Sequence, residues 1–266
     1  MTTKRVVIVG GGPVGATLAL TLQHHGVPVT MLEAREKGAA YQDQRALALS
    51  YGSRRILEKL GVWDRLDAQA TAINTIHISQ RGSLGRSLLK AQEHDLPALG
   101  YVLSYGALTR ALDEVLAQFN DLEIVYQAEA KHIEPGVDVA TVEFAHQGQS
   151  QKVASPLLVL ADGGRSLGDI PGIQRETKMY GHDALVSKVK TELPHKHIAY
   201  ERFTPMGPVA LLPNGQDFSL VWTGKAEEVE KIMQLDDAEF LRQLHQHFGD
   251  RVGQFLAVEK RITFPL

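Results

Sequence analysis

A short apolar strand that runs directly into a glycine-rich turn constrains the fold of this chain more than any other feature. Residues 6–9 are Val-Val-Ile-Val, and Gly10, Gly12 and Gly15 follow with the spacing G-x-G-x-x-G. In such a turn the first glycine permits a tight bend, the second lets the backbone approach a pyrophosphate, and the third lets the next helix pack against the strand. The pattern therefore predicts a βαβ nucleotide-binding unit.

The residues after the glycines complete this unit. Pro13 stands at the expected first position of a helix, where its fixed φ is favourable and its missing N–H is not needed. Gly26 ends the helix, and the strand VPVTMLE then leads to Glu33. A carboxylate at the end of this second strand can accept hydrogen bonds from both hydroxyls of an adenosine ribose, which favours NAD or FAD over NADP. The unit by itself does not distinguish NAD from FAD.

The rest of the chain departs from the repeated strand-helix units of an NAD dehydrogenase. We expect a loop over 34–50, helical structure over 51–70, an antiparallel excursion over 73–101, a helix over 108–119 and several strands over 122–161. Asp162 and Gly163 follow the last strand, at the edge where ligands of open α/β sheets bind. An Asp-Gly pair is also common in simple turns.

Composition and motifs exclude several other classes. The net charge is -3 with no dense run of Lys or Arg, so nucleic acid is not an expected partner. The chain has no cysteine, which excludes disulfides and thiolate metal sites. The histidine pairs at 195/197 and 245/247 lack a third nearby ligand, so we expect no metal site. No apolar run reaches the roughly 18 residues of a membrane span.

Three segments together resemble a known family. GGGPVG and LADGGRS, with DQRALALSYGS between them, are similar to motifs of the flavoprotein aromatic hydroxylases related to p-hydroxybenzoate hydroxylase. RALALSYGSRRILEKLGVWD and AYERFTPMGPVALLP resemble the ubiquinone-biosynthesis ring hydroxylases, of the 2-octaprenyl-6-methoxyphenol hydroxylase type. The resemblance implies that the bound nucleotide is FAD.

The resemblance also assigns roles to individual residues. It implies that the glycines bind the pyrophosphate, Glu33 the adenosine ribose, Arg45 and Arg110 the phosphate side of the flavin, and Asp162 the ribityl chain near the path of the reduced nicotinamide. Guanidinium groups suit phosphate oxygens, although an arginine is also often a solvated surface charge. The implied cofactor-binding positions are Gly10, Gly12, Pro13, Gly15, Glu33, Ala34, Arg35, Arg45, Arg110, Asp162 and Gly163.

The predicted fold class is α/β: an FAD-binding Rossmann-like domain of the glutathione-reductase and p-hydroxybenzoate hydroxylase type, interleaved with an α+β substrate domain on a mainly antiparallel sheet. We expect the FAD-binding domain over 1–72 and 101–172, with its C-terminal part missing, and the substrate domain over 73–100 and 173–266. In the resemblance the sheet of the second domain lies over the flavin ring. Five residues are then candidates to border an apolar substrate cavity: Tyr200, Arg202, Leu211, Pro213 and Trp222.

The implied function is hydroxylation of a polyprenylated phenol by O2 in ubiquinone biosynthesis, with NAD(P)H as electron donor, through a flavin C4a-hydroperoxide. Because the cofactor supplies this chemistry, no side chain is predicted to be a catalytic acid or base. Expected partners are pathway enzymes, a second copy of the chain and the membrane surface. The expected location is the cytoplasm, with peripheral contact at the inner face of the membrane.

Two departures from the family pattern keep alternatives open. Gly168 stands where the family usually has an arginine, and the chain ends at RITFPL, before the family's third flavin motif. A non-catalytic or truncated subunit with the same fold is therefore one alternative. An FAD-dependent oxidase or dehydrogenase is another, although it should lack AYERFTPMGPVALLP.

Overall fold

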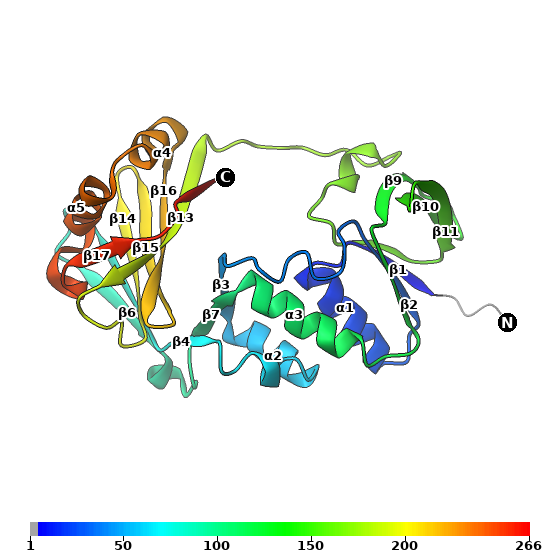
Figure 1. Cartoon of the computed structure of the whole chain (residues 1–266), viewed down its shortest axis with the longest axis horizontal. Helices are drawn as coiled ribbons and strands as arrows, with labels where there is room; N and C mark the ends of the chain where they lie inside the picture. Colours follow the sequence, from blue (N-terminus) through cyan, green and yellow to red (C-terminus); the bar gives the residue numbers. More distant parts are fainter. Residues whose placement is uncertain (1–4) are drawn as a thin grey trace. The chain divides into compact units, whose positions relative to one another are not determined.

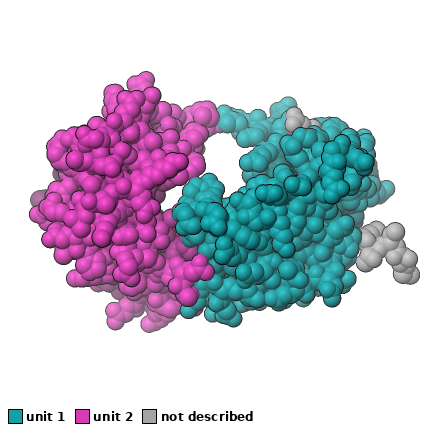
Figure 2. All heavy atoms as spheres, viewed as in Figure 1, with its two compact units in different colours: residues 1–45, 55–67, 104–177 teal, residues 46–54, 68–103, 178–266 magenta. Residues whose placement is uncertain are grey.

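The computed structural model describes residues 5–266 and divides into two compact units. Unit 1 contains residues 1–45, 55–67 and 104–177, and unit 2 contains residues 46–54, 68–103 and 178–266 (Figure 2). The chain therefore passes between the units several times. Residues 46–54 were expected in the FAD-binding domain but belong to unit 2, because residues 46–50 form a strand of that unit and the first residues of a helix follow directly.

Unit 1 is built on a parallel sheet in the order β12-β1-β2-β8; β1 and β2 are labelled in Figure 1. Its strands are β1 (Val6–Val9), β2 (Val29–Glu33), β8 (Leu122–Tyr126) and β12 (Leu158–Leu160). Every residue of β1 and β2 is buried, as expected for parallel strands that are covered on both faces. Helices α1 (Pro13–His24) and α3 (Tyr105–Leu116) pack against each other beside this sheet.

A three-stranded antiparallel sheet completes unit 1. Its strands are β9 (Glu129–Glu134), β10 (Ala140–His146) and β11 (Gln149–Ser155). Ile133, Val142 and Phe144 from this sheet form one buried cluster with Val7 and Leu32 of the parallel sheet. The two sheets of unit 1 therefore share a hydrophobic core.

Unit 2 is built on a large and mainly antiparallel sheet, in the order β17-β13-β16-β15-β14-β5-β6, with β18 also paired to β13. Only β5 and β14 are paired in parallel among these strands. The strands are β5 (Thr75–Gln80), β6 (Arg86–Lys90), β13 (His182–Thr191), β14 (Ile198–Thr204), β15 (Gly207–Asn214), β16 (Asp217–Lys225), β17 (Phe255–Val258) and β18 (Ile262–Pro265).

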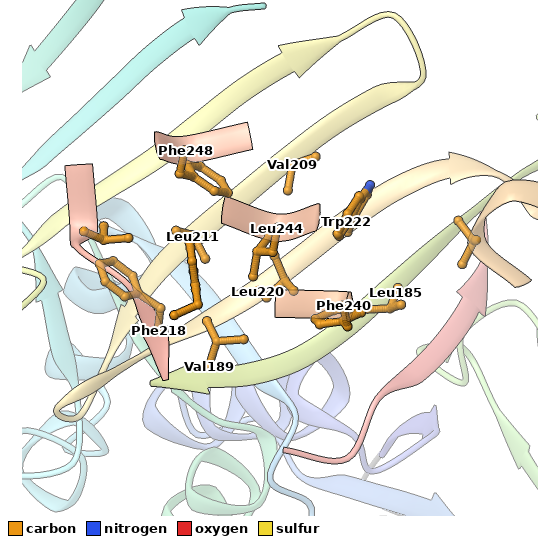
Figure 3. Packing of buried hydrophobic residues seen from close by; sticks show 13 residues of the cluster. Leu185, Val189, Val209, Leu211, Phe218, Leu220, Trp222, Phe240, Leu244 and Phe248 are labelled. Carbon is orange, nitrogen blue, oxygen red and sulfur yellow. The ribbon is translucent and has the colours of Figure 1, made fainter. Parts of the chain in front are cut away.

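Helix α5 (Asp237–Phe248) covers one face of this sheet, and α4 (Ala226–Met233) follows β16. Phe240, Leu244 and Phe248 of α5 are buried against Leu211 and Trp222 of the strands (Figure 3). The three helix residues recur at intervals of four, which places them on one side of the helix. Asp236 caps α5, since its carboxylate accepts a hydrogen bond of 2.8 Å from the amide of Glu239.

A smaller sheet lies against the other face of the large sheet. Its order is β3-β7-β4, and its strands are β3 (Ala46–Ser50), β4 (Thr71–Ile73) and β7 (Gly100–Ser104). Ile73 and Val102 of this sheet are buried against Ala199 of β14. Gly100 permits close packing, since a Cβ there would lie 2.6 Å from the carbonyl oxygen of Leu49.

The structure corrects two expectations in this region. Residues 46–50 were predicted as loop but form β3, because β7 supplies them with a strand partner from elsewhere in the sequence. Residues 62–70 were predicted as helix, but only the short 3-10 helix Trp63–Arg65 forms after α2 (Tyr51–Lys59). None of the helices within residues 5–266 is long and apolar enough to cross a membrane.

Candidate functional site

The glycine turn leaves no room for side chains at two of its positions. Gly10 has a φ of +104°, and a Cβ there would lie 2.5 Å from the carbonyl oxygen of Ala161. A Cβ on Gly15 would lie 2.0 Å from the carbonyl oxygen of Gly10. The turn therefore passes directly against the end of β12, and α1 packs directly on the turn.

The N-terminus of α1 faces a cavity of about 800 Å³ within unit 1. Gly12 occupies the cap position and provides no capping side chain, and Pro13 is the first helical residue. The first amides of the helix are thus left without side-chain partners, and a helix N-terminus of this kind binds phosphate. Gly12, Pro13 and Val14 all line the cavity.

Glu33 is buried at the end of β2, and its carboxylate is held in place by three donors. The amide of Gly11 donates to Oε2 at 2.7 Å, and the amide and Nε of Arg35 donate to Oε1 at 2.9 and 2.8 Å. Burial alone would raise the pKa of Glu33, but the hydrogen bonds from Arg35 and Gly11 outweigh it and lower the pKa. A carboxylate accepts about four hydrogen bonds, so Oε2 keeps capacity for one ligand hydroxyl.

Asp162 lines the same cavity from the end of β12, and its own loop holds its carboxylate. The amide of Gly164 donates to Oδ1 at 3.0 Å, while the amide and hydroxyl of Ser166 donate to Oδ2 at 2.8 and 2.6 Å. Burial would raise the pKa of Asp162, yet the bonds from Ser166 and Gly164 lower it overall. The orientation of this carboxylate is therefore fixed by the loop, with acceptor capacity remaining on Oδ1.

The cavity is also lined by several cationic side chains. Arg45 lies over the ring of Tyr105 at 5.1 Å and is paired with Asp43, whose Oδ1 is 2.9 Å from its Nε. This hydrogen bond from Arg45 holds the pKa of Asp43 below its usual range. Lys131 and Arg165 line other parts of the cavity. Lys131 is paired with Glu129, which also lines the cavity. Guanidinium groups such as those of Arg45 and Arg165 suit the phosphates of a ligand.

The structure brings most of the predicted cofactor-binding residues together at this cavity. The lining includes Gly10, Gly12, Pro13, Glu33, Ala34, Arg35, Arg45, Asp162 and Gly163. Gly15 lies in the adjoining helix. Arg110 is not among the lining residues: it is exposed on α3, and its guanidinium lies 5.2 Å from the ring of Tyr41.

Several lining residues were not found from the sequence, among them Tyr105, Lys131, His132 and Arg165. Tyr105 begins α3 directly after a strand, and Ser104 caps that helix through a 3.1 Å bond from the amide of Ala107. A Ser before a helical pattern was an available signal for this second helix start. Lys131 and His132 lie on β9, and nothing local in the sequence places that strand beside the glycine turn.

The five residues predicted for a substrate cavity lie on the face of the large sheet that packs against α5, and their role stays a prediction. Leu211 and Trp222 are in the hydrophobic core beneath α5, and Pro213 is buried on the same side of β15 as Leu211. Arg202 lies two positions from Tyr200 on this face, where its Nη1 donates to Ser79 Oγ at 3.1 Å. Strand alternation predicts two sets of residues on opposite faces of the sheet. It does not predict which of the two faces packs against α5.

A smaller cavity of about 250 Å³ lies within unit 2, between β3 and β7 on one side and β14 and β15 on the other. Tyr200 borders this cavity, although its ring packs against Phe218 and Phe248 at centroid distances of 6.1 and 6.4 Å. Glu201 and Leu212, from the opposite face to Leu211, also line the cavity. No group of three or more potential metal ligands occurs within residues 5–266.

Comparison with known proteins agrees with the geometry of the larger cavity. A family model described as an FAD binding domain matches residues 3–262. The chain belongs to this FAD-binding family. The donor set fits the cofactor, since the glycine turn and the helix N-terminus leave space for a pyrophosphate and Glu33 keeps capacity for a ribose hydroxyl.

Among curated proteins, the chain is 32% identical to the ubiquinone hydroxylase UbiL of Rhodospirillum rubrum, over 98% of this chain and 61% of that protein. It is 27% identical to 3-demethoxyubiquinol 3-hydroxylase of Escherichia coli, over 93% of this chain and 64% of that protein. The chain therefore spans about three fifths of these relatives. The resemblance to ubiquinone-biosynthesis hydroxylases is confirmed at the level of the family.

Solved structures confirm the predicted fold. The p-nitrophenol 4-monooxygenase PnpA of Pseudomonas putida matches with a TM-score of 0.74 at 18% identity, over 98% of this chain and 67% of that one. The flavin-dependent halogenase CmlS matches with a TM-score of 0.76 at 18% identity, over all of this chain and 50% of that one. The fold is that of the p-hydroxybenzoate hydroxylase-like flavoproteins.

Proposed function

We propose that this chain forms the FAD-binding and substrate-binding part of a monooxygenase that hydroxylates a polyprenylated phenol in ubiquinone biosynthesis. The observation that carries the FAD proposal is the glycine turn, packed against β12 beside the fixed carboxylate of Glu33. The choice of substrate is supported by the relatives, which are ubiquinone ring hydroxylases. NAD(P)H is the proposed electron donor.

In this proposal the side chains bind and orient, while FAD supplies the redox chemistry when it is bound. The α1 N-terminus and Gly12 would hold the pyrophosphate, and Glu33 would hold the adenosine ribose. Arg45 is already ordered by Asp43 and Tyr105, so little side-chain entropy is lost when it approaches a phosphate. Asp162 holds the ribityl chain through its remaining acceptor capacity on Oδ1. No side chain is assigned a proton-transfer step.

The first experiment identifies the bound nucleotide. This chain, and any longer product of its gene, would be desalted and treated with acid, and the released ligand identified by chromatography and absorbance. FAD in either protein supports the proposal, and phenol-stimulated NAD(P)H oxidation with a hydroxylated product is then the expected activity. NAD in the extract contradicts it, as does the absence of any FAD binding by the full-length product. FAD binding without NAD(P)H oxidation favours the non-catalytic subunit.

We further propose that unit 2 contacts an anionic membrane surface through two neighbouring turns. The turns follow β5 and β14, which are parallel neighbours, and the amide of Arg81 donates to the carbonyl of Phe203 at 2.8 Å. Leu84 is fully exposed, while Phe203 and Met206 are about half exposed. Exposed apolar turns beside basic residues favour binding at a bilayer interface.

The basic residues beside these turns are four arginines: Arg81, Arg86, Arg202 and Arg251. No carboxylate within residues 5–266 forms an ion pair with any of them. Burial is the main cause that lowers the pKa of His247 to about 4, and the charges of Arg81 and Arg202 add to it. Clustered arginines favour the phosphates of acidic lipids.

Vesicle sedimentation tests this contact. We expect the protein to bind vesicles with 30% phosphatidylglycerol more tightly than phosphatidylcholine vesicles, and Arg81→Ala with Arg86→Ala to weaken binding about tenfold or more, at about 1 kcal/mol per residue. The matched control is Lys231→Ala with Arg242→Ala, since these two exposed cations already pair with Glu228 and Glu239. An equal loss of vesicle binding in the two double variants would contradict the proposed membrane-contacting surface. Association with pathway enzymes and with a second copy stay predictions.

A further inference from the structure

The cavity in unit 2 is enclosed mainly by apolar side chains. Its walls include Leu49 of β3, Ile73 of β4, Ile76 of β5 and Leu212 of β15, together with Leu99, which directly precedes β7. Ile73 and Ala199 also belong to the buried cluster that joins the small sheet to the large one. The cavity is therefore a gap between two packed sheets, on the face of the large sheet opposite α5.

Glu201 introduces a carboxylate into this apolar space. It follows Tyr200 on β14, and because the ring of Tyr200 packs on the α5 side, strand alternation directs Glu201 to the opposite face. Glu201 is partly buried and lines the cavity. Burial raises the pKa of its carboxyl group, and no neighbouring charge contributes to the shift.

Within residues 5–266, no hydrogen bond or ion pair holds this carboxylate. Ser50 Oγ, a hydroxyl of another lining residue, pairs with Ser53 Oγ at 3.1 Å. Glu33 and Asp162 each have three donors, so Glu201 differs from the other carboxylates of the candidate sites. No oxygen of Glu201 is among the fully buried side-chain atoms that lack a partner, so the carboxylate remains open to solvent. Its acceptor sites are therefore available to a ligand that enters the cavity.

The size and lining of the cavity limit its ligand. An apolar cavity of about 150 Å³ accommodates benzene, so about 250 Å³ accommodates one ring with small substituents. The apolar walls favour a neutral ring, and the carboxylate of Glu201 can accept a hydrogen bond from a donor on that ring. A phenol meets both conditions, because it combines an apolar ring with one O–H group.

We propose that this cavity binds the ring of a phenol and that Glu201 accepts a hydrogen bond from the phenol hydroxyl. The choice of a phenol over other O–H donors rests on the proposed function, whereas the position of the donor rests on Glu201 itself. The bond would fix which edge of the ring points toward β14. Glu201 is thus a binding residue that determines the orientation of the substrate ring.

The test measures ligand binding by protein without added FAD, so that it is independent of the nucleotide experiment. Amide cross-peaks in NMR titrations would follow 2-methoxyphenol and 1,2-dimethoxybenzene, which differ in the O–H donor. We expect 2-methoxyphenol to shift the amides of Gly100 and Ala199 and to bind about tenfold more tightly than the ether, as expected for one hydrogen bond to a charged acceptor.

Two variants complete a binding cycle. Glu201→Met keeps a similar side-chain volume without an acceptor, and we expect it to remove the difference between the two ligands. Glu201→Gln keeps a hydrogen-bond acceptor and should retain part of the difference in affinity between 2-methoxyphenol and the ether. Glu259→Gln is the control, since this glutamate is exposed outside the cavity. Equal affinities for phenol and ether in the wild type, or an unchanged difference in Glu201→Met, would overturn the inference.

A further ligand separates a phenol site from a cation site. Benzylammonium has a similar ring and a positive charge, and we expect it to bind more weakly than 2-methoxyphenol because the apolar walls disfavour a charge. Tighter binding of benzylammonium would overturn the phenol assignment. If FAD is bound but phenol is not, this inference fails while the proposed function stands.

Discussion

Carboxylates in this protein take different roles according to the donors around them. Glu33 and Asp162 are each held by three donors and lie at the ends of parallel strands. Their positions depend on short stretches of sequence, and both were predicted as site residues. Glu201 has no donor within residues 5–266, and this isolation depends on which strands and helices surround it.

At Gly10, we expect substitution by alanine to destabilise the protein and to abolish FAD binding. The φ of +104° is unfavourable for alanine, and the Cβ would also collide with Ala161. Gly26→Ala is the matched control, because Gly26 has a φ of +70° with no atom within 4 Å of the added Cβ. Gly26→Ala should lower the free energy of unfolding by about 1 kcal/mol. Urea unfolding and FAD titration measure both effects, and equal costs at the two positions would contradict the role of the close approach.

Glu33→Gln is expected to lower the free energy of unfolding in a pH-dependent manner. Because the pKa of Glu33 is lowered in the folded state, its stabilisation is present above the unfolded value near 4.5 and is lost as the pH falls through the folded value. At pH 7 the variant should have a free energy of unfolding about 1 to 3 kcal/mol below that of the wild type. This difference between the two proteins should become smaller below about pH 4. Urea unfolding at several pH values checks this, with the exposed Glu36→Gln as control. A difference that does not vary with pH would argue against ionised Glu33 as the cause.

The sequence predicted a mainly antiparallel sheet in this domain, but it did not predict which face of the sheet α5 covers. Leu211 and Trp222 face α5, while Leu212 and Glu201 face the small sheet. Alternating patterns specify two faces without specifying what covers each. In β15 both faces carry apolar residues, so hydrophobicity did not distinguish them. Likewise, β3 forms only because β7 lies beside it.

Phe240→Ala on α5 is expected to destabilise unit 2 by about 3 to 5 kcal/mol. Phe240 is fully buried, its ring lies 5.8 Å from that of Trp222, and the Arg261 guanidinium lies 4.9 Å from it. Phe203→Ala removes a half-exposed ring from the same unit and should cost much less. Urea unfolding followed by Trp222 fluorescence compares the two variants. Similar losses would indicate that α5 contributes little to the core.

At the scale of the whole molecule, the chain crosses between two units that each contain a separate cavity. The larger cavity lies within unit 1, and the smaller one within unit 2. Each unit also contains one buried tryptophan, Trp63 in unit 1 and Trp222 in unit 2. Ligand binding to either unit can therefore be followed by a separate probe.

We expect FAD to raise the unfolding temperature reported by Trp63. A ligand at 100 times its dissociation constant adds about 2.7 kcal/mol to the stability of the state that binds it. The variants Trp222→Phe and Trp63→Phe isolate the two signals. A larger shift at Trp63 than at Trp222 locates the stabilisation in unit 1, and an equal shift indicates cooperative unfolding of both units. No shift at saturating FAD would contradict FAD binding by this chain.

The sequence by itself determined the nucleotide-binding unit, the family and the part of the larger cavity formed by the glycine turn, Glu33 and Asp162. It did so because the strand, the glycine turn, the helix and Glu33 interact within a short stretch of chain, where steric and hydrogen-bonding requirements restrict residue types directly. Only the tertiary structure decided which face of the unit 2 sheet α5 covers, that Arg110 lies outside the cavity, and that Glu201 has no partner. These features depend on contacts between segments distant in sequence, and no local pattern specifies such contacts.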